Sequence, residues 1–205
     1  MEKKNFQLIT DEIISALPKD RRPLLLLHTC CAPCGSYVLK YLSEYFDIDV
    51  LYYNPNIFPS EEYAKRLSEL EKLCALGNFS GRVQLIEIGY YPERFVEAAK
   101  GLENEPEGGA RCEKCFRLRL TEAALEAKKR NADRFSTTLS VSPHKNSALL
   151  NQIGGELEKE YNIRYLYSDF KKRGGYKKSI ELSKKYGLYR QDYCGCEFSI
   201  KRKKK

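Results

Sequence analysis

Residues 24–34 read LLLLHTCCAPC, and this stretch decides both the fold and the chemistry that we expect of the chain. Leu24 to His28 is a continuous apolar run of strand length, which is typical of a central strand buried on both faces of a parallel sheet. A nucleotide-binding α/β protein would place a glycine-rich phosphate loop directly after such a strand. Three cysteines stand there instead, so we expect sulfur chemistry at the end of the first strand.

The segments around this stretch alternate between strand and helix patterns. We predict strands over residues 24–28, 49–53, 83–88 and 134–138, with a short one near 164–166. Helices are predicted over residues 6–17, 35–46, 92–100, 115–130, 146–160 and 176–186, with another beginning near Ser60. This alternation indicates α/β architecture: one open, mostly parallel sheet with helices on both faces, in a single domain over residues 1–205. The ligand site of such a sheet lies beyond the carboxyl ends of its strands.

The composition suits a globular domain, with 42% hydrophobic and 31% charged residues in a chain of 205. No run approaches the roughly 18 to 20 apolar residues that a membrane-spanning helix needs, and the first residues lack the pattern of a signal peptide. We therefore expect a cytoplasmic protein with no membrane partner. In a reducing compartment, its eight cysteines favour metal or redox roles over structural disulfides.

Seven of the eight cysteines lie in three short motifs: Cys30-Cys31-Ala32-Pro33-Cys34, Cys112-Glu113-Lys114-Cys115 and Cys194-Gly195-Cys196. CxxC spacing points two sulfurs the same way from a turn or a helix start, so two such pairs predict a site for zinc or a cubane iron–sulfur cluster. The 77 residues between Cys34 and Cys112 exceed the spacing of a zinc ribbon. Seven thiols also exceed the needs of one four-ligand site, so the pattern favours iron–sulfur over zinc.

The Cys194–Cys196 pair has two interpretations. Two cysteines separated by one glycine can close a small strained disulfide, which is the labile, redox-active kind. Alternatively, both bind a second metal with Asp192 as an oxygen ligand. We favour the redox dithiol. Cys74 differs from the other seven, because it completes an apolar helical stripe with Leu67 and Leu70 and is expected in the core.

The net charge of +8 is unevenly distributed along the chain. Residues 171–205 hold 13 Lys and Arg against 3 Asp and Glu, whereas the remaining 170 residues are slightly acidic. Such a basic segment is typical of a nucleic-acid partner or of a solubilising tail. Within it, residues 169–176 mix basic, aromatic and glycine residues that suit an RNA backbone and a stacked base. Residues 137–146 are hydroxyl-rich and lead into a helix start. Such a segment is typical of a phosphate-binding site or of ordinary helix capping.

Further motifs accompany the cysteines. They are Tyr53-Asn54-Pro55-Asn56, Thr137-Thr138-Leu139-Ser140 and the long run from Asp169 to Ser199. Together with HTCCAPC, the distant CxxC and DYCGC, they resemble the QueH family of epoxyqueuosine reductases over residues 24–199.

The resemblance implies more than the composition does. It implies an adenine-nucleotide α-hydrolase-like fold without the nucleotide loop. It implies an oxidoreductase that converts epoxyqueuosine to queuosine at the tRNA wobble position, the last step of queuosine biosynthesis. By this resemblance Cys30, Cys31, Cys112 and Cys115 hold a [4Fe–4S] cluster. Cys194 and Cys196 are then a redox-active pair or ligands of a second mononuclear metal, iron or zinc.

The remaining expectations follow from this family. Cys34 matches the motif and counts with the other six motif cysteines as a metal-ligand candidate. The basic segment 171–205 is expected to pack on the metal site, where tRNA carrying epoxyqueuosine and an unidentified electron donor would meet it. Removing the epoxide oxygen as water takes two electrons and two protons, and Asp192, Tyr193 and His28 are candidate proton donors. The competing hypothesis is a zinc-stabilised RNA-binding module without catalysis.

Overall fold

A computed structural model describes residues 4–203 of the chain. Four parallel strands form one sheet in the order β3-β2-β1-β4. The strands are β1 (Leu24–His28), β2 (Asp47–Tyr52), β3 (Val83–Glu87) and β4 (Arg134–Thr137). The apolar run that opens the sequence therefore forms an inner strand, as its hydrophobicity predicted. The predicted strand near 164–166 is reduced to an isolated bridge between Tyr165 and Phe135.

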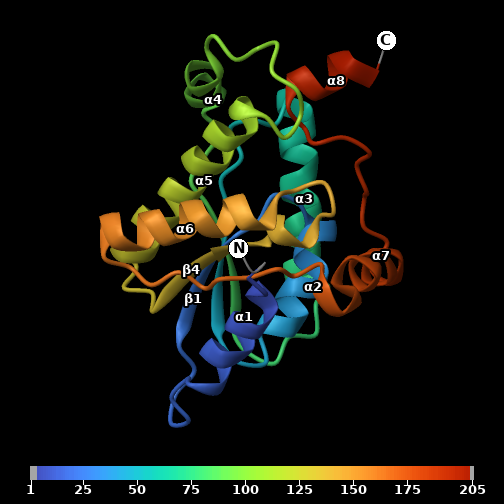
Figure 1. The fold of residues 1–205 in the computed structure, drawn as a ribbon. Coiled ribbons are helices and arrows are strands. Elements are labelled where there is room, and N and C mark those ends of the chain that lie inside the picture. The colour runs from blue at the N-terminus through green and yellow to red at the C-terminus, as the bar shows by residue number, and fades with distance from the viewer. Residues whose placement is uncertain (1–3, 204–205) are drawn as a thin grey trace.

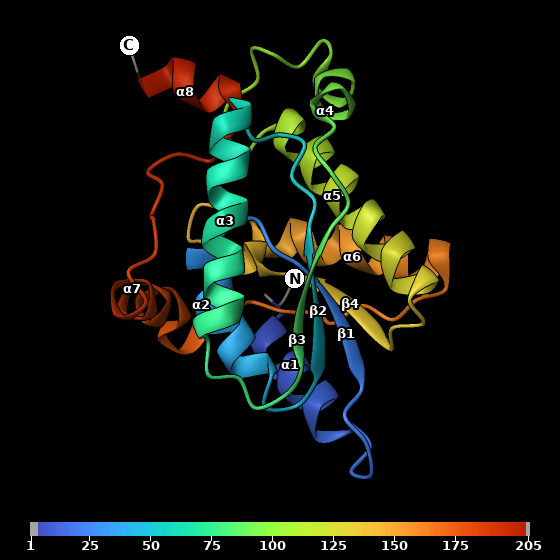
Figure 2. The same ribbon diagram turned by 180° about the vertical axis from the view of Figure 1, so that it is seen from behind.

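Helices cover both faces of the sheet (Figures 1 and 2). They are α1 (Phe6–Ser15), α2 (Ala32–Leu42), α3 (Ser60–Leu76), α4 (Pro92–Ala99), α5 (Ala110–Lys129), α6 (Ser147–Tyr161), α7 (Gly175–Lys185) and α8 (Glu197–Lys203). Short 3₁₀ helices occupy Thr138–Val141 and Lys172–Gly174. This arrangement confirms the predicted α/β class with an open parallel sheet and helices on both faces. Among the described helices, none combines the length and apolar character that a membrane crossing requires.

Strand β1 supplies both halves of the core because successive side chains point to opposite faces of a sheet. Leu25 and Leu27 pack with the inner faces of α2 and α3, whereas Leu26 packs with α5 and α6. All three leucines are fully buried. The continuous apolar run is thus the consequence of burial on both sides.

Two helices begin earlier than the sequence pattern predicted. Helix α2 begins at Ala32, three residues early, with Pro33 in its first turn, where the fixed φ of proline suits a helix start. Helix α5 begins at Ala110, five residues early. These starts matter because Cys34 and Cys112 now lie in the first turns of their helices, and Cys115 lies in the second turn of α5. Helix α8 was not among the helices predicted from the sequence.

The carboxyl ends of the parallel strands meet at one edge of the sheet, as the order of the motifs along the chain predicted. Cys30 and Cys31 follow β1 directly, and Thr138 follows β4. The chain returns to this edge after α7, and residues 190–194 lie between α7 and α8 beside α3 in both views (Figures 1 and 2).

Candidate metal and substrate site

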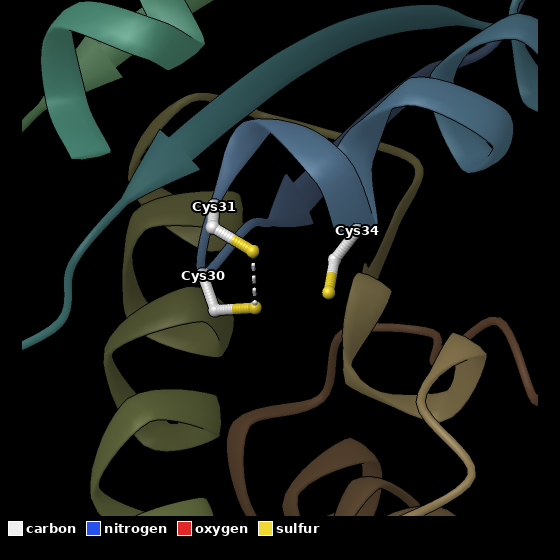
Figure 3. A group of neighbouring side chains, drawn as sticks. All are labelled: Cys30, Cys31 and Cys34. Carbon is white, nitrogen blue, oxygen red and sulfur yellow. Dashed lines mark hydrogen bonds between the residues drawn. The ribbon is translucent and has the colours of Figure 1, made fainter. Parts of the chain in front are cut away.

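Cys30, Cys31 and Cys34 form a compact thiol group at the junction of β1 and α2. Their sulfurs point into the same space (Figure 3). The Cys30 and Cys31 sulfurs are 3.6 Å apart, and all three lie within 4.8 Å of one another. That spacing allows one metal ion to contact all three, so this group is a candidate metal site.

The three thiols do not ionise equally. Hydrogen bonds from Cys30 and Cys34 hold the pKa of Cys31 well below its ordinary value, and Gln191 Nε2 adds a hydrogen bond of 2.9 Å to its sulfur. Its two thiol neighbours and burial raise the pKa of Cys34 well above the ordinary value. The group therefore favours a thiolate at Cys31, which is the form that binds metals.

A second set of thiols lines a small cavity beneath the first turns of α5. Cys112 and Cys115 meet Cys194 and Cys196 there, together with Phe95. Cys115 and Cys196 are buried and pack in one apolar cluster with Phe95. The CxC pair thus lies beside the second CxxC pair, a neighbourhood that the spacing along the chain does not reveal.

A larger pocket of about 680 Å³ shares part of its wall with the small cavity. Cys30, Cys34 and Cys194 line it, so residues from all three motif regions reach its wall or the adjoining cavity. Arg119, Lys145 and Cys194 line both spaces. The C-terminal segment supplies one wall through Arg190, Gln191, Asp192, Tyr193 and Cys194. This pocket is the candidate substrate site.

Three buried or half-buried cations surround the thiols. Lys145 Nζ lies 3.3 Å from Cys194 Sγ and 3.0 Å from Glu107 Oε1. Arg66 and Arg119 line the large pocket although each is only 2% exposed. Positive charges in such a setting stabilise thiolates and other anions.

Sequence reasoning missed Arg66, Arg119 and Gln191. Arg119 sits on the inward face of α5, next to the buried Phe116 and Leu120. A charged residue inside an apolar helical stripe was the available signal, because such a residue is rarely buried without a partner. Gln191 carried no comparable signal, since it stands in an irregular segment.

His28, one of the candidate proton donors, has a structural role. It is fully buried, with Nδ1 2.9 Å from Thr137 Oγ1 and Nε2 3.2 Å from the Tyr53 carbonyl oxygen. Burial, followed by the charge of Arg119, lowers the pKa of His28 to about 3. It does not line the pocket, so its imidazole joins two strand ends and is poorly placed to donate a proton.

The disulfide expected between Cys194 and Cys196 is not supported, because all eight cysteines of the chain are free thiols. Cys74, which was expected in the core, is half-buried and packs against the core cluster that includes α2 and α3, and burial raises its pKa to about 11. The seven motif thiols are soft donors that suit iron–sulfur clusters or zinc. The residues present therefore fit a metal centre, and the free state of the CxC pair fits either a reduced dithiol or a ligand pair.

Comparison with known proteins decides the family. The model of the family described as epoxyqueuosine reductase QueH matches residues 25–202, almost the whole chain. The chain belongs to this family. The relationship inferred from the cysteine motifs is therefore confirmed, and the competing zinc-stabilised binding module is not favoured.

Curated relatives support the assignment across distant bacteria. An epoxyqueuosine reductase QueH from Staphylococcus epidermidis is 43% identical over 203 residues, covering 97% of this chain and 85% of the relative. The protein of that name from Streptococcus pyogenes is 40% identical, covering 98% of this chain and 80% of the relative. The Thermotoga maritima protein is 38% identical over 177 residues, 86% of this chain and 90% of its own.

Solved structures show only a distant likeness. The U34-tRNA thiolase NcsA from Methanococcus maripaludis, described with its [4Fe–4S] cluster, has a TM-score of 0.48 at 11% identity, covering 94% of this chain and 67% of the thiolase. A phosphoadenylyl-sulfate reductase from Candida auris has a TM-score of 0.33 at 13% identity, covering 66% and 61% of the two chains. Values this low carry no argument about the site.

Proposed function

We propose that this chain is an oxidoreductase that reduces epoxyqueuosine in tRNA to queuosine, the last step of queuosine biosynthesis. The reaction breaks the two C–O bonds of the epoxide, leaves an alkene and releases the oxygen as water, with two electrons and two protons supplied. One observation carries the proposal beyond family membership: a pocket of about 680 Å³ is lined by Cys30, Cys34 and Cys194. A substrate in this pocket lies against thiols from two distant motifs.

We propose a [4Fe–4S] cluster as the cofactor, with Cys30, Cys31, Cys112 and Cys115 as its ligands. Such a cluster supplies electrons one at a time. Cys194 and Cys196 lie beside the second ligand pair, which suits either a dithiol that stores two electrons or ligands of a second mononuclear metal, iron or zinc. Cys34 is the remaining ligand candidate, since its sulfur belongs to the compact thiol group.

The chain's own residues hold the substrate and deliver protons. Asp192 and Tyr193 both line the pocket, and we propose Asp192 as the proton donor with Tyr193 as the alternative. The Tyr193 hydroxyl donates to the Phe58 carbonyl oxygen at 3.3 Å, so its ring is held at the pocket wall. His28 is set aside, because it is buried away from the pocket.

We propose that the basic segment 171–205 binds the tRNA in the cytoplasm and packs on the metal site; Lys204 and Lys205 lie outside the described residues. Tyr176 and Arg190 of this segment line the pocket, and Tyr176 is 37% exposed. An exposed aromatic ring beside basic side chains suits a stacked base and its phosphates. We propose an electron donor as a further partner of the protein.

Mass spectrometry of tRNA nucleosides tests the function. A strain lacking the gene should accumulate epoxyqueuosine and lose queuosine, and the intact gene should restore queuosine. A copy encoding Cys194→Ser should not restore it, whereas Cys74→Ser should, because Cys74 lines neither the large pocket nor the small cavity. Normal queuosine in the deletion strain, or full restoration by Cys194→Ser, would overturn the proposal.

A further inference from the structure

Arg119 is a buried cation between the two thiol sets. It lies on the inward face of α5 and is only 2% exposed. It lines the large pocket with Cys30 and Cys34, and it lines the small cavity with Cys112 and Cys115. The proposed reaction by itself assigns this arginine no role.

The partners of Arg119 leave its charge uncompensated. Its Nη1 donates to Asn54 Oδ1 at 3.1 Å, and Asn54 in turn donates to the carbonyl oxygen of Thr29 at 3.0 Å. Its Nε is buried without a hydrogen-bond partner. None of the ion pairs found over residues 4–200, whose side chains the structure describes, includes Arg119, whereas Arg66 is paired with Glu62 at 2.7 Å.

Burial of an unpaired guanidinium is unfavourable, so buried charges are normally paired with an anion. The groups whose charge acts on Arg119 are thiols: Cys112 and Cys115 of its own helix, Cys30 from the loop after β1, and Cys194 from the segment before α8. These become anionic only as thiolates or as ligands of a metal centre. We infer that Arg119 is the buried counter-charge of the cysteine centre, a positioning residue that raises the reduction potential of that centre.

The direction of the effect follows from electrostatics. Reduction adds negative charge to the centre, and a fixed positive charge nearby stabilises the more negative state. Removing the charge therefore makes the centre harder to reduce. The hydrogen bond to Asn54 keeps the guanidinium against the loop that carries Cys30, so orientation and charge act together. This inference rests on the proposed metal centre and refines how that centre is tuned.

The test is the midpoint potential of the anaerobically reconstituted full-length protein, measured by a spectroscopic redox titration. Arg119→Gln should shift the midpoint to a more negative value, whereas Arg119→Lys, which keeps the positive charge, should have a midpoint close to that of the wild type. Arg134→Gln is the matched control, because Arg134 is a partly buried arginine at the opposite end of β4. It should leave the potential unchanged.

Each outcome decides the inference. A midpoint for Arg119→Gln equal to the wild type, or an equal shift in the Lys variant, overturns it and indicates a purely structural role. If the Gln variant binds too little iron to titrate, the Lys variant decides: a wild-type potential supports the inference, and equal loss of iron overturns it. Turnover of epoxyqueuosine by the wild-type protein is measured in parallel, so failure of the proposed function is distinguished from failure of this inference.

Discussion

Gly195 lies directly against the guanidinium of Arg66. A Cβ at Gly195 would stand 2.8 Å from Arg66 Nη1 and 3.1 Å from Nη2, and the φ of Gly195 is +99°. Arg66 Nη1 also donates to the Cys194 carbonyl oxygen at 3.2 Å. The glycine of the CxC motif is thus required by backbone conformation and by close packing, and a buried arginine holds the turn that carries both thiols.

Gly195→Ala should therefore disable the site while the fold persists. The positive φ alone disfavours alanine by about 1 to 2 kcal/mol, and the added methyl group must also displace Arg66 from the turn. We expect a large loss of turnover and reduced metal content, measured by reductase assay and elemental analysis. Gly101→Ala is the control, because Gly101 has a φ of +77° and a Cβ there would meet nothing within 4 Å. Equal loss of activity in both variants would contradict the packing argument.

Replacing either cysteine of the CxC pair should remove turnover without unfolding the chain. Cys194→Ser and Cys196→Ser keep the side-chain size but lose the soft sulfur, and we expect activity to fall by about 100-fold or more. Cys74→Ser should retain activity and lose about 1 kcal/mol of stability, because it places a hydroxyl in a partly apolar site. Reductase assays with thermal unfolding measure both effects. A Cys194→Ser enzyme with wild-type turnover would exclude this pair from the reaction.

The thiol group at the end of β1 should determine metal loading. After anaerobic reconstitution with iron and sulfide, the wild-type protein should be brown with broad absorbance near about 400 nm. Cys31→Ser should lose most of that absorbance, since Cys31 is the thiol whose pKa is held lowest in its group. Elemental analysis gives iron per chain. A colourless wild-type protein that retains only zinc would refute the iron–sulfur proposal.

The exposed lysines of α7 should contribute to tRNA affinity. Lys177 and Lys184 are exposed on this helix, which also supplies Tyr176 and Ser179 to the pocket wall. The double variant Lys177→Glu/Lys184→Glu should bind tRNA more weakly. The slope of the logarithm of the binding constant against the logarithm of salt concentration should become less steep by about 0.7 to 0.9 for each phosphate contact that is lost.

The matched control for this experiment reverses two charges elsewhere. Lys128 on α5 and Lys159 on α6 are also exposed, and these helices lie on the opposite side of the molecule from α7 (Figures 1 and 2). Their double Glu variant should bind tRNA almost as the wild type does. Equal weakening in both double variants would mean that net charge, and not the α7 surface, governs binding.

The Arg21–Asp133 pair should make stability depend on pH at the acidic end. Arg21 donates to Asp133 at 2.9 Å, and the Leu24 amide donates to the same carboxylate at 2.8 Å. The hydrogen bond from Arg21 is the main cause that lowers the pKa of Asp133 below its ordinary value of 3.8. The unfolded chain therefore takes up this proton first, so the stabilisation is complete above that ordinary value and is lost as the pH falls through the folded pKa.

Asp133→Asn tests that dependence. At pH 7 the variant should be less stable by about 1 kcal/mol, the scale of a partly exposed pair. The difference should shrink as the pH falls below about 4. Urea unfolding followed by circular dichroism at several pH values measures it. A difference that stays constant down to acidic pH would show that the carboxylate charge contributes nothing.

Much of the fold followed from local patterns. The apolar run Leu24–His28 and the strand–helix alternation predicted a parallel sheet, because strand burial and helical periodicity are written in neighbouring residues. The same patterns placed the helix starts of α2 and α5 too late. Their first turns hold cysteines, proline and charged residues, so hydrophobic periodicity begins only after the backbone has become helical.

By itself, the sequence determined the α/β class, the three cysteine motifs and the family to which they belong, because each depends on residues close together in the chain. Only the tertiary structure decided which motifs meet. It placed Cys194 and Cys196 beside Cys112 and Cys115, and it buried Arg119 between the two thiol sets. Those relationships join segments roughly 80 residues apart, and the packing of helices on a folded sheet brings them together where spacing along the chain carries no information.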